Sequence, residues 1–240
     1  NNKIHQKLKN IMITKKSNLV FSADLTSKTE ILKIINKVGK HICALKLHSD
    51  IIEDFDDEFI TNLLKLSNHH NFLLFEDRKY CDIGNTFEKQ YYSKLFKVNK
   101  WADLISIHCI AGSGILDVLK NHNYDRGVLL VSQMSTKNNL INKEYTNRVI
   151  DLSEKYSDIV VGIIGQQFDN SNFFNFTPGI NRENNVDNKD QVYNNPIDAV
   201  KNNTDIFIIG RAIYQSDNPE KESLKYQTIC WESYYNLKST

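Results

Sequence analysis

Charged and hydroxyl side chains recur in pairs two residues apart, and each pair ends a short apolar run. Ser22 stands with Asp24, Lys46 with His48, and Asp77 with Lys79. Residues two apart on a β-strand point to the same side of the sheet. If these runs are neighbouring strands, two ammonium groups and several carboxylates meet in one place. Preorganised charges of this kind can stabilise charge that develops on a bound molecule.

A structural ion-pair cluster is the alternative interpretation. For Asp77 and Lys79 taken alone it stays open, because structural networks also perturb ionisation. Buried charges are costly unless they are paired, and Lys46 and Asp24 are predicted to reach the same rim. This convergence favours a catalytic site over a structural one.

The elements that would position these residues alternate regularly. Short aliphatic and β-branched runs are each followed by a stretch of helical period, as in a parallel α/β fold. The predicted strands are 19–24, 42–48, 72–79, 104–109, 127–133, 159–165, 173–179 and 206–211. The predicted helices are 4–13, 28–38, 57–69, 87–98, 114–120, 143–156, 196–202 and 219–237. We therefore expect a single α/β domain over 1–240, a (β/α)8 TIM barrel with a short N-terminal helix: a lead-in segment, 1–18, and the barrel, 19–240.

Composition fits this fold and narrows the function. The chain has 240 residues, 40% hydrophobic and 25% charged, with a net charge of +1. No overall field attracts nucleic acid or a membrane, so an anionic ligand needs a local basic site. The four cysteines form no CxxC pair, and there is neither an HExxH motif nor a long apolar run. We expect a cytoplasmic protein without a metal site.

In such a barrel the carboxyl ends of the strands form the active-site face. Polar residues also end the later runs, as Gln133-Met134-Ser135, Thr177-Pro178-Gly179 and Gly210-Arg211. The planar guanidinium of Arg211 suits a phosphate, because its forked donors match the oxygen geometry. The same rim is thus predicted to hold a charged cluster and an anion site.

Residues 75–86 carry a specific motif. They match the D-x-K-x-x-D-I signature of orotidine 5'-monophosphate decarboxylases at Asp77, Lys79, Asp82 and Ile83. Further stretches look like that family in the same order, so the resemblance covers most of the chain: Ser22–Asp24, Lys46–His48, Trp101–Asp103, Thr177–Gly179 and Gly210–Arg211. Two segments, 166–172 and 181–190, depart from the family's usual sequence.

The resemblance implies a cofactor-free decarboxylation of orotidine 5'-monophosphate to uridine 5'-monophosphate, the last step of de novo pyrimidine biosynthesis. It implies that Lys79 donates a proton to C6, that Asp77 lies against the scissile carboxylate, and that Lys46 and Asp24 bind ribose hydroxyls. Asp82 completes the implied catalytic set. The remaining implied substrate-binding residues are Ser22, His48, Ile83, Thr86, Met134, Ser135, Pro178, Gln191, Tyr193, Gly210 and Arg211.

The resemblance also implies partners. Asp82, Ile83 and Thr86 would reach into the neighbouring subunit's site in a twofold homodimer. The segment before residue 19 is similar to the lead-in found when this domain follows an orotate phosphoribosyltransferase in bifunctional UMP synthase. We therefore expect a fused parent polypeptide.

Two other functions stay open beside decarboxylation of the nucleotide. One is a metal-dependent sugar-phosphate decarboxylase of the same superfamily, although strand two offers Lys46 and His48 where a metal would need a carboxylate. The other is a barrel that only binds pyrimidine nucleotides. The sequence also leaves open whether Asp77 destabilises the substrate carboxylate or positions Lys79.

Overall fold

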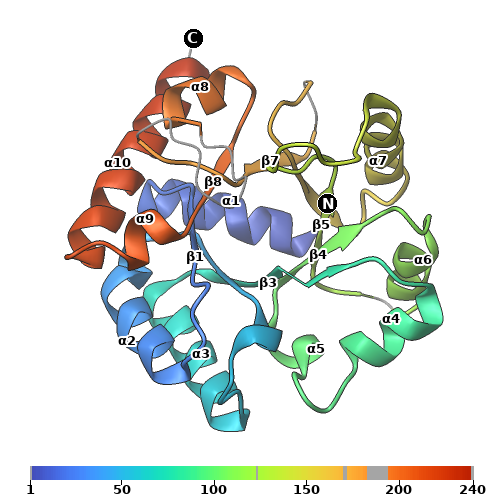
Figure 1. Cartoon of the computed structure of the whole chain (residues 1–240), viewed down its shortest axis with the longest axis horizontal. Helices are drawn as coiled ribbons and strands as arrows, with labels where there is room; N and C mark the ends of the chain where they lie inside the picture. Colours follow the sequence, from blue (N-terminus) through green and yellow to red (C-terminus); the bar gives the residue numbers. More distant parts are fainter. Residues whose placement is uncertain (1, 123, 170–171, 183–193, 239–240) are drawn as a thin grey trace.

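The computed structural model describes residues 2–122, 124–169, 172–182 and 194–238. Within them, eight parallel strands close into a barrel in sequence order (Figure 1). The strands are β1 (Leu19–Ser22), β2 (Ala44–Leu47), β3 (Leu73–Tyr80), β4 (Leu104–His108), β5 (Gly127–Val131), β6 (Val160–Ile164), β7 (Phe174–Thr177) and β8 (Ile206–Ile209). The predicted TIM barrel is confirmed, and it includes the helix that precedes the first strand.

Helices form the wall around this barrel (Figure 1). They are α1 (Lys3–Lys15), α2 (Lys28–Val38), α3 (Asp57–His70), α4 (Gly84–Tyr91), α5 (Val98–Trp101), α6 (Gly114–Asn121), α7 (Lys143–Lys155), α8 (Pro196–Lys201), α9 (Arg211–Tyr214) and α10 (Pro219–Lys238). Two 3-10 turns, Gly39–His41 and Ser49–Ile51, flank β2. No helix in the described part of the chain is both long and apolar enough to span a bilayer.

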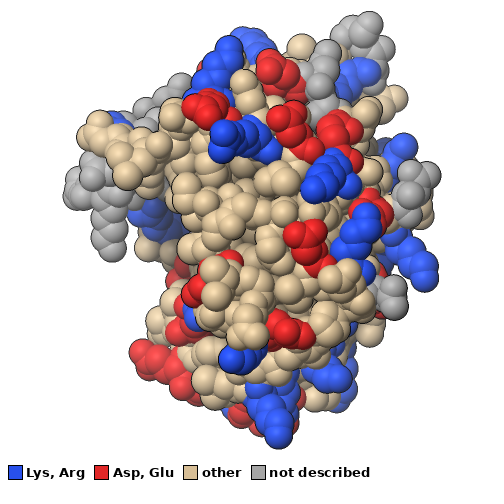
Figure 2. All heavy atoms as spheres, turned by 90° about the vertical axis from the view of Figure 1, so that its right-hand side faces the viewer, with Lys and Arg blue, Asp and Glu red and all other residues tan. Residues whose placement is uncertain are grey.

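The outer surface carries charges of both signs. Figure 2 shows the side formed by α4, α6 and α7, where Lys, Arg, Asp and Glu side chains surround an area without them. Large apolar side chains are exposed near α4 and in the loop after β4: Ile83 is 64% exposed and Ile110 72%. This side therefore combines scattered charge with exposed apolar groups.

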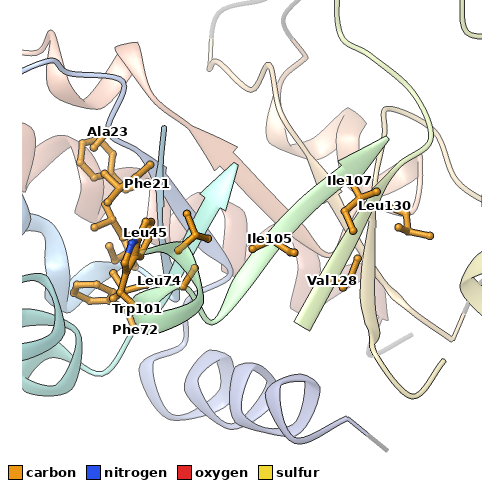
Figure 3. Packing of buried hydrophobic residues seen from close by; sticks show 14 of the residues in the cluster. Phe21, Ala23, Leu45, Phe72, Leu74, Trp101, Ile105, Ile107, Val128 and Leu130 are labelled. Carbon is orange, nitrogen blue, oxygen red and sulfur yellow. The ribbon is translucent and has the colours of Figure 1, made fainter. Parts of the chain in front are cut away.

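Alternation along the strands divides the core into two clusters. Leu19 and Phe21 face the helices, whereas Val20 faces the barrel interior. The outer cluster, between strands and helices, includes Leu45, Leu74, Trp101, Ile105 and Leu130 (Figure 3). The period of two of a β-strand produces this division. It also directs the polar side chains that end the strands into the barrel mouth.

Helix α1 closes the opposite end of the barrel. Its buried Ile4, Leu8, Ile11 and Met12 belong to the inner cluster. At its last turn, Lys15 Nζ donates hydrogen bonds to the carbonyl oxygens of Gly39, His70 and Asn71 at 2.8, 2.7 and 3.1 Å. The lysine thus ties α1 to the ends of α2 and α3. The barrel is sealed below and open at its carboxyl rim.

The helix predicted over 87–98 is wrong in its bounds. Helix α4 begins at Gly84 and ends at Tyr91, and a separate short helix starts at Val98. Lys97 takes the left-handed conformation at φ 46°, which cannot continue a helix. Likewise, the strand predicted over 206–211 ends at Ile209, and Arg211 begins α9.

Strand β3 departs from regular pairing where it meets the signature. Glu76 pairs with Ile105 and Tyr80 with Ile107. An advance of four residues along β3 therefore corresponds to an advance of only two residues along β4. Lys79 has φ 50°, a conformation uncommon for residues other than glycine. Bulges of this kind re-aim side chains. Both Asp77 and Lys79 face the cavity at the barrel mouth described below.

Candidate active site

A cavity of about 610 Å³ opens at the carboxyl ends of the strands. It brings together most of the residues predicted from the sequence, from the ends of six strands. Those that line it are Ser22, Asp24, Lys46, His48, Asp77, Lys79, Met134, Ser135, Pro178, Gly210 and Arg211. Polar groups that converge in a concave site are the usual form of a ligand pocket.

Lys46 lies at the centre of the charged cluster. Its Nζ is 2.9 Å from Asp77 Oδ2, 3.3 Å from Asp24 Oδ1 and 3.0 Å from His48 Nε2. Its side chain is only 6% exposed. Each of its three N–H bonds therefore has an acceptor. This pairing makes the burial of a lysine tolerable.

Asp77 lies between two ammonium groups. Lys79 Nζ is 2.8 Å from the same Oδ2 that Lys46 approaches. The other oxygen, Oδ1, accepts a hydrogen bond from Ser106 Oγ at 2.8 Å. Asp77 is buried, yet Lys79 keeps about a third of its side chain exposed toward the cavity. A carboxylate thus fixes an ammonium group at the edge of open space.

Electrostatics keep this cluster charged. Burial by itself raises the pKa of Asp77, but the ammonium groups of Lys46 and Lys79 outweigh burial and hold that pKa well below its usual range. Burial lowers the pKa of Lys46, and the carboxylates of Asp77 and Asp24 outweigh it, so the net direction is upward. Both groups are therefore ionised at neutral pH.

His48 and Asp24 complete the cluster. Burial and the adjacent Lys46 ammonium lower the pKa of His48, so its neutral ring accepts the Lys46 hydrogen bond through Nε2. Burial raises the pKa of Asp24, but the Lys46 ammonium and the hydrogen bond from Ser22 outweigh it, so the pKa lies below its usual value. Ser22 Oγ donates to Asp24 Oδ1 at 2.9 Å.

The far side of the cavity is built from β5, β7 and β8. Gly210 follows β8, where an added Cβ would lie 3.1 Å from the Ser22 carbonyl oxygen, so a side chain there would crowd β1. Gly179 has φ 72°, which glycine adopts without steric cost. Pro178 and Arg211, each next to one of these glycines, line the cavity.

Some predicted residues lie elsewhere. Asp82 and Ile83 are exposed and Thr86 is partly exposed, and none of the three lines this cavity. They stand on the segment from the end of β3 into α4, where Asp82 Oδ1 accepts from the Ile83 amide at 2.7 Å. Gln191 and Tyr193 lie outside the described residues.

Sequence reasoning missed several residues of the site. Ser106, in the middle of β4, contacts Asp77, and Gln215 and Ser216 line the cavity just after α9. Ser106 stands in the run Leu-Ile-Ser-Ile-His. It is the only hydroxyl residue among the alternate positions of this run that face the barrel interior. That single polar residue was the signal available.

The described side chains at the cavity do not form a metal site. Among the residues that the structure describes, no group of three or more His, Cys, Asp or Glu side chains is arranged to hold one. The space between Asp24 and Asp77, where a divalent ion would need to bind, is filled by the Lys46 ammonium. These residues do not fit a metal-dependent sugar-phosphate decarboxylase.

Comparison with known proteins gives the family. The model of the Orotidine 5'-phosphate decarboxylase / HUMPS family matches residues 17–226. The chain belongs to this family. It is 38% identical to the orotidine 5'-phosphate decarboxylase of Schizosaccharomyces pombe over 240 residues, which cover 97% of this chain and 91% of that protein. The enzyme of that name from Solorina crocea is 37% identical, covering 97% and 90%.

A longer relative is also similar to this chain, and solved structures share its fold. The uridine 5'-monophosphate synthase of Bos taurus is 38% identical over 95% of this chain, which corresponds to 48% of the bovine protein. Orotidine 5'-monophosphate decarboxylase from Methanocaldococcus jannaschii, complexed with the inhibitor BMP, superposes with a TM-score of 0.67 at 23% identity, covering 88% of this chain and 97% of that one. A putative decarboxylase of the same kind from Toxoplasma gondii gives 0.71 at 14%, covering 98% and 97%. At these identities the structures show the shared fold.

Proposed function

We propose that this protein decarboxylates orotidine 5'-monophosphate to uridine 5'-monophosphate, the last step of de novo pyrimidine biosynthesis. The observation that carries the proposal is the Lys46–Asp77–Lys79 array, in which Asp77 Oδ2 lies 2.9 and 2.8 Å from two ammonium groups at the cavity wall. The activity named for the relatives at 37–38% identity supports it.

The reaction needs charge stabilisation. When the bond from C6 to the carboxylate breaks, carbon dioxide leaves and the electron pair stays on C6 in an orbital orthogonal to the ring π system. The Lys79 ammonium stabilises that pair, because a fixed charge in a water-poor site needs no reorganisation. A proton then passes from Lys79 Nζ to C6, and the resulting amine regains a proton from solvent.

Asp77 and its neighbours hold the reacting groups in place. We assign the carboxylate of Asp77 to the neighbourhood of the scissile carboxylate, where it repels the substrate, orients Lys79, or does both. Lys46 and Asp24 bind the ribose hydroxyls, with Ser22 and His48 beside them. Ser135, Met134 and Pro178 contact the pyrimidine, and Gly210 and Arg211 bind the phosphate together with Gln191 and Tyr193.

We further propose a twofold homodimer with composite sites. Asp82, Ile83 and Thr86 lie outside their own subunit's cavity on an exposed segment, although the signature places Asp82 only three residues after Lys79. The 64% exposure of Ile83 and the uncharged area on the side formed by α4, α6 and α7 (Figure 2) fit a surface that another subunit covers. The cytoplasmic location and the fusion to a phosphoribosyltransferase stay predictions.

One assay tests the proposed reaction. Purified protein is mixed with orotidine 5'-monophosphate, and the loss of substrate absorbance is followed with and without EDTA. We expect turnover that EDTA leaves unchanged. Lys79→Ala should abolish it while circular dichroism and Tm show a retained fold. Full activity of Lys79→Ala, or turnover only with added divalent metal, would contradict the proposal.

A further inference from the structure

The hydroxyl of Ser106 makes two contacts inside the charged cluster. Ser106 Oγ donates to Asp77 Oδ1 at 2.8 Å and accepts a hydrogen bond from the backbone amide of Lys79 at 3.0 Å. Ser106 is fully buried in β4 and does not line the cavity. It therefore contacts the Asp77 carboxylate and the Lys79 backbone from behind, without lining the cavity where a ligand would bind.

The Lys79 amide needs such a partner because of the irregular pairing. Between Glu76 and Tyr80, β3 has more residues than the facing stretch of β4, so regular ladder hydrogen bonds are interrupted there. A buried amide without an acceptor is destabilising. Ser106 supplies the acceptor from the strand opposite the irregularity. The hydroxyl thus stabilises the turn of backbone in which Lys79 has φ 50°.

The second contact fixes the Asp77 carboxylate. With Oδ1 held by Ser106, Oδ2 is directed at both Lys46 and Lys79. Rotation of the carboxylate by a few tens of degrees would weaken the two ion pairs together. The Ser106 hydroxyl thereby fixes both the backbone conformation at Lys79 and the orientation of the Asp77 carboxylate.

We propose that Ser106 is a positioning residue for the reaction, acting through Asp77 and Lys79. This inference rests on the proposed decarboxylase function. Because Ser106 has no access to the cavity, its loss should lower kcat and leave KM nearly unchanged. Misplacement of a catalytic group by a fraction of an ångström to about 1 Å lowers rates by up to roughly 100-fold.

The experiment compares Ser106→Ala, which lacks both hydrogen bonds, with Ser106→Thr, which keeps the hydroxyl. Steady-state kinetics on orotidine 5'-monophosphate and thermal unfolding are measured for both. We expect kcat of Ser106→Ala to fall roughly 10- to 100-fold with KM within about threefold of wild type. Ser106→Thr should recover most of kcat. Ser106→Cys, similar in size with a weak hydrogen-bonding sulfur, should lie between them and serves if the threonine methyl group prevents folding.

Ser132→Ala is the matched control. Ser132 is about as buried as Ser106 and directly follows the neighbouring strand β5, and its Oγ donates to the Ile164 carbonyl rather than to the charged cluster, at 3.1 Å. Its kcat should stay close to wild type. The inference is wrong if Ser106→Ala loses Tm but keeps kcat, or if Ser132→Ala loses kcat equally. Wild-type protein that shows no turnover in the same assay rejects the proposed function instead.

Discussion

The role of a charged side chain in a site depends on its neighbours, as Lys46 illustrates. Its ammonium is buried among Asp24, Asp77 and His48, so it orients two carboxylates while staying out of solvent. Lys79 pairs with the same Asp77 but remains partly exposed to the cavity. Two lysines with one shared partner thereby have different surroundings, which fit the proposed division into a ribose-binding Lys46 and a proton-donating Lys79.

Arg211 gives the first prediction at this scale. It lines the same cavity as Lys79 from the start of α9, where the proposal places the phosphate. Removing charge-assisted hydrogen bonds from a guanidinium costs about 3 kcal/mol, roughly 100-fold in kcat/KM. We therefore expect Arg211→Ala to lower kcat/KM on the nucleotide at least that far. Arg148→Ala, which removes an exposed arginine on α7, is the control and should leave kcat/KM unchanged. Wild-type kcat/KM in Arg211→Ala would remove the phosphate assignment.

Glu76 gives a prediction about pH. It is fully buried, faces the helices rather than the cavity, and accepts hydrogen bonds from the amide and hydroxyl of Ser49. Burial raises the pKa of Glu76 to about 8, although Ser49 opposes the rise. Between the pKa of Glu76 in the unfolded chain and about pH 8, the folded state therefore binds more protons than the unfolded state. Stability falls as pH rises through that window.

Glu76→Gln should remove this fall. From about pH 5 to pH 8, the unfolding free energy of wild type should fall relative to that of Glu76→Gln. The slope of this relative fall should be up to about 1.4 kcal/mol per pH unit. Urea unfolding at several pH values measures it. Glu154→Gln, which removes an exposed carboxylate on α7, is the matched control. Parallel curves for wild type and Glu76→Gln would show that Glu76 ionises normally.

At the scale of elements, the closure of the barrel by α1 depends on Lys15. Lys15→Met keeps most of the side-chain volume but leaves three carbonyl oxygens, on Gly39, His70 and Asn71, without this donor. We expect a loss of about 1–3 kcal/mol in unfolding free energy. Turnover at 25 °C should stay unchanged, because α1 lies at the sealed end. Lys9→Met, exposed on α1, is the control for the charge change. A Lys15→Met protein with reduced kcat but unchanged stability would contradict this separation.

The strands were predictable as short continuous apolar runs, and the long helices as the stretches between those runs. Polar residues at strand ends also predicted which side chains would meet, since parallel strands end at the same rim. Short elements had no period to detect: α9 has four residues, and its start at Arg211 was taken as the end of a strand. Ser106 was missed for another reason, because its role depends on irregular pairing between β3 and β4. Such pairing is decided across strands and leaves no local pattern.

At the scale of the whole molecule, the proposed dimer makes each active site depend on two chains. Ile83→Asp should give a monomer in sedimentation with little activity, because a charge would enter the covered apolar surface. A mixing experiment separates assembly from catalysis. Lys79→Ala and Asp82→Ala, each inactive alone, should recover about a quarter of wild-type activity when subunits exchange, because half of the dimers are mixed and each holds one native site. No recovery, with exchange demonstrated, would place Asp82 outside the partner's site.

Strand β3 also constrains how this sequence can change in length. Leu74 and Tyr80 face the helices, while Asp77 and Lys79 face the cavity, and Arg78 between them pairs with Asp50 on the outside. Replacing Arg78 alters only that outer pair. Deleting it would reverse inside and outside for everything that follows on the strand, turning the Lys79 ammonium toward the apolar helices and the Tyr80 ring into the catalytic pocket. The spacing of one residue between aspartate and lysine is therefore less replaceable than the residue that fills it.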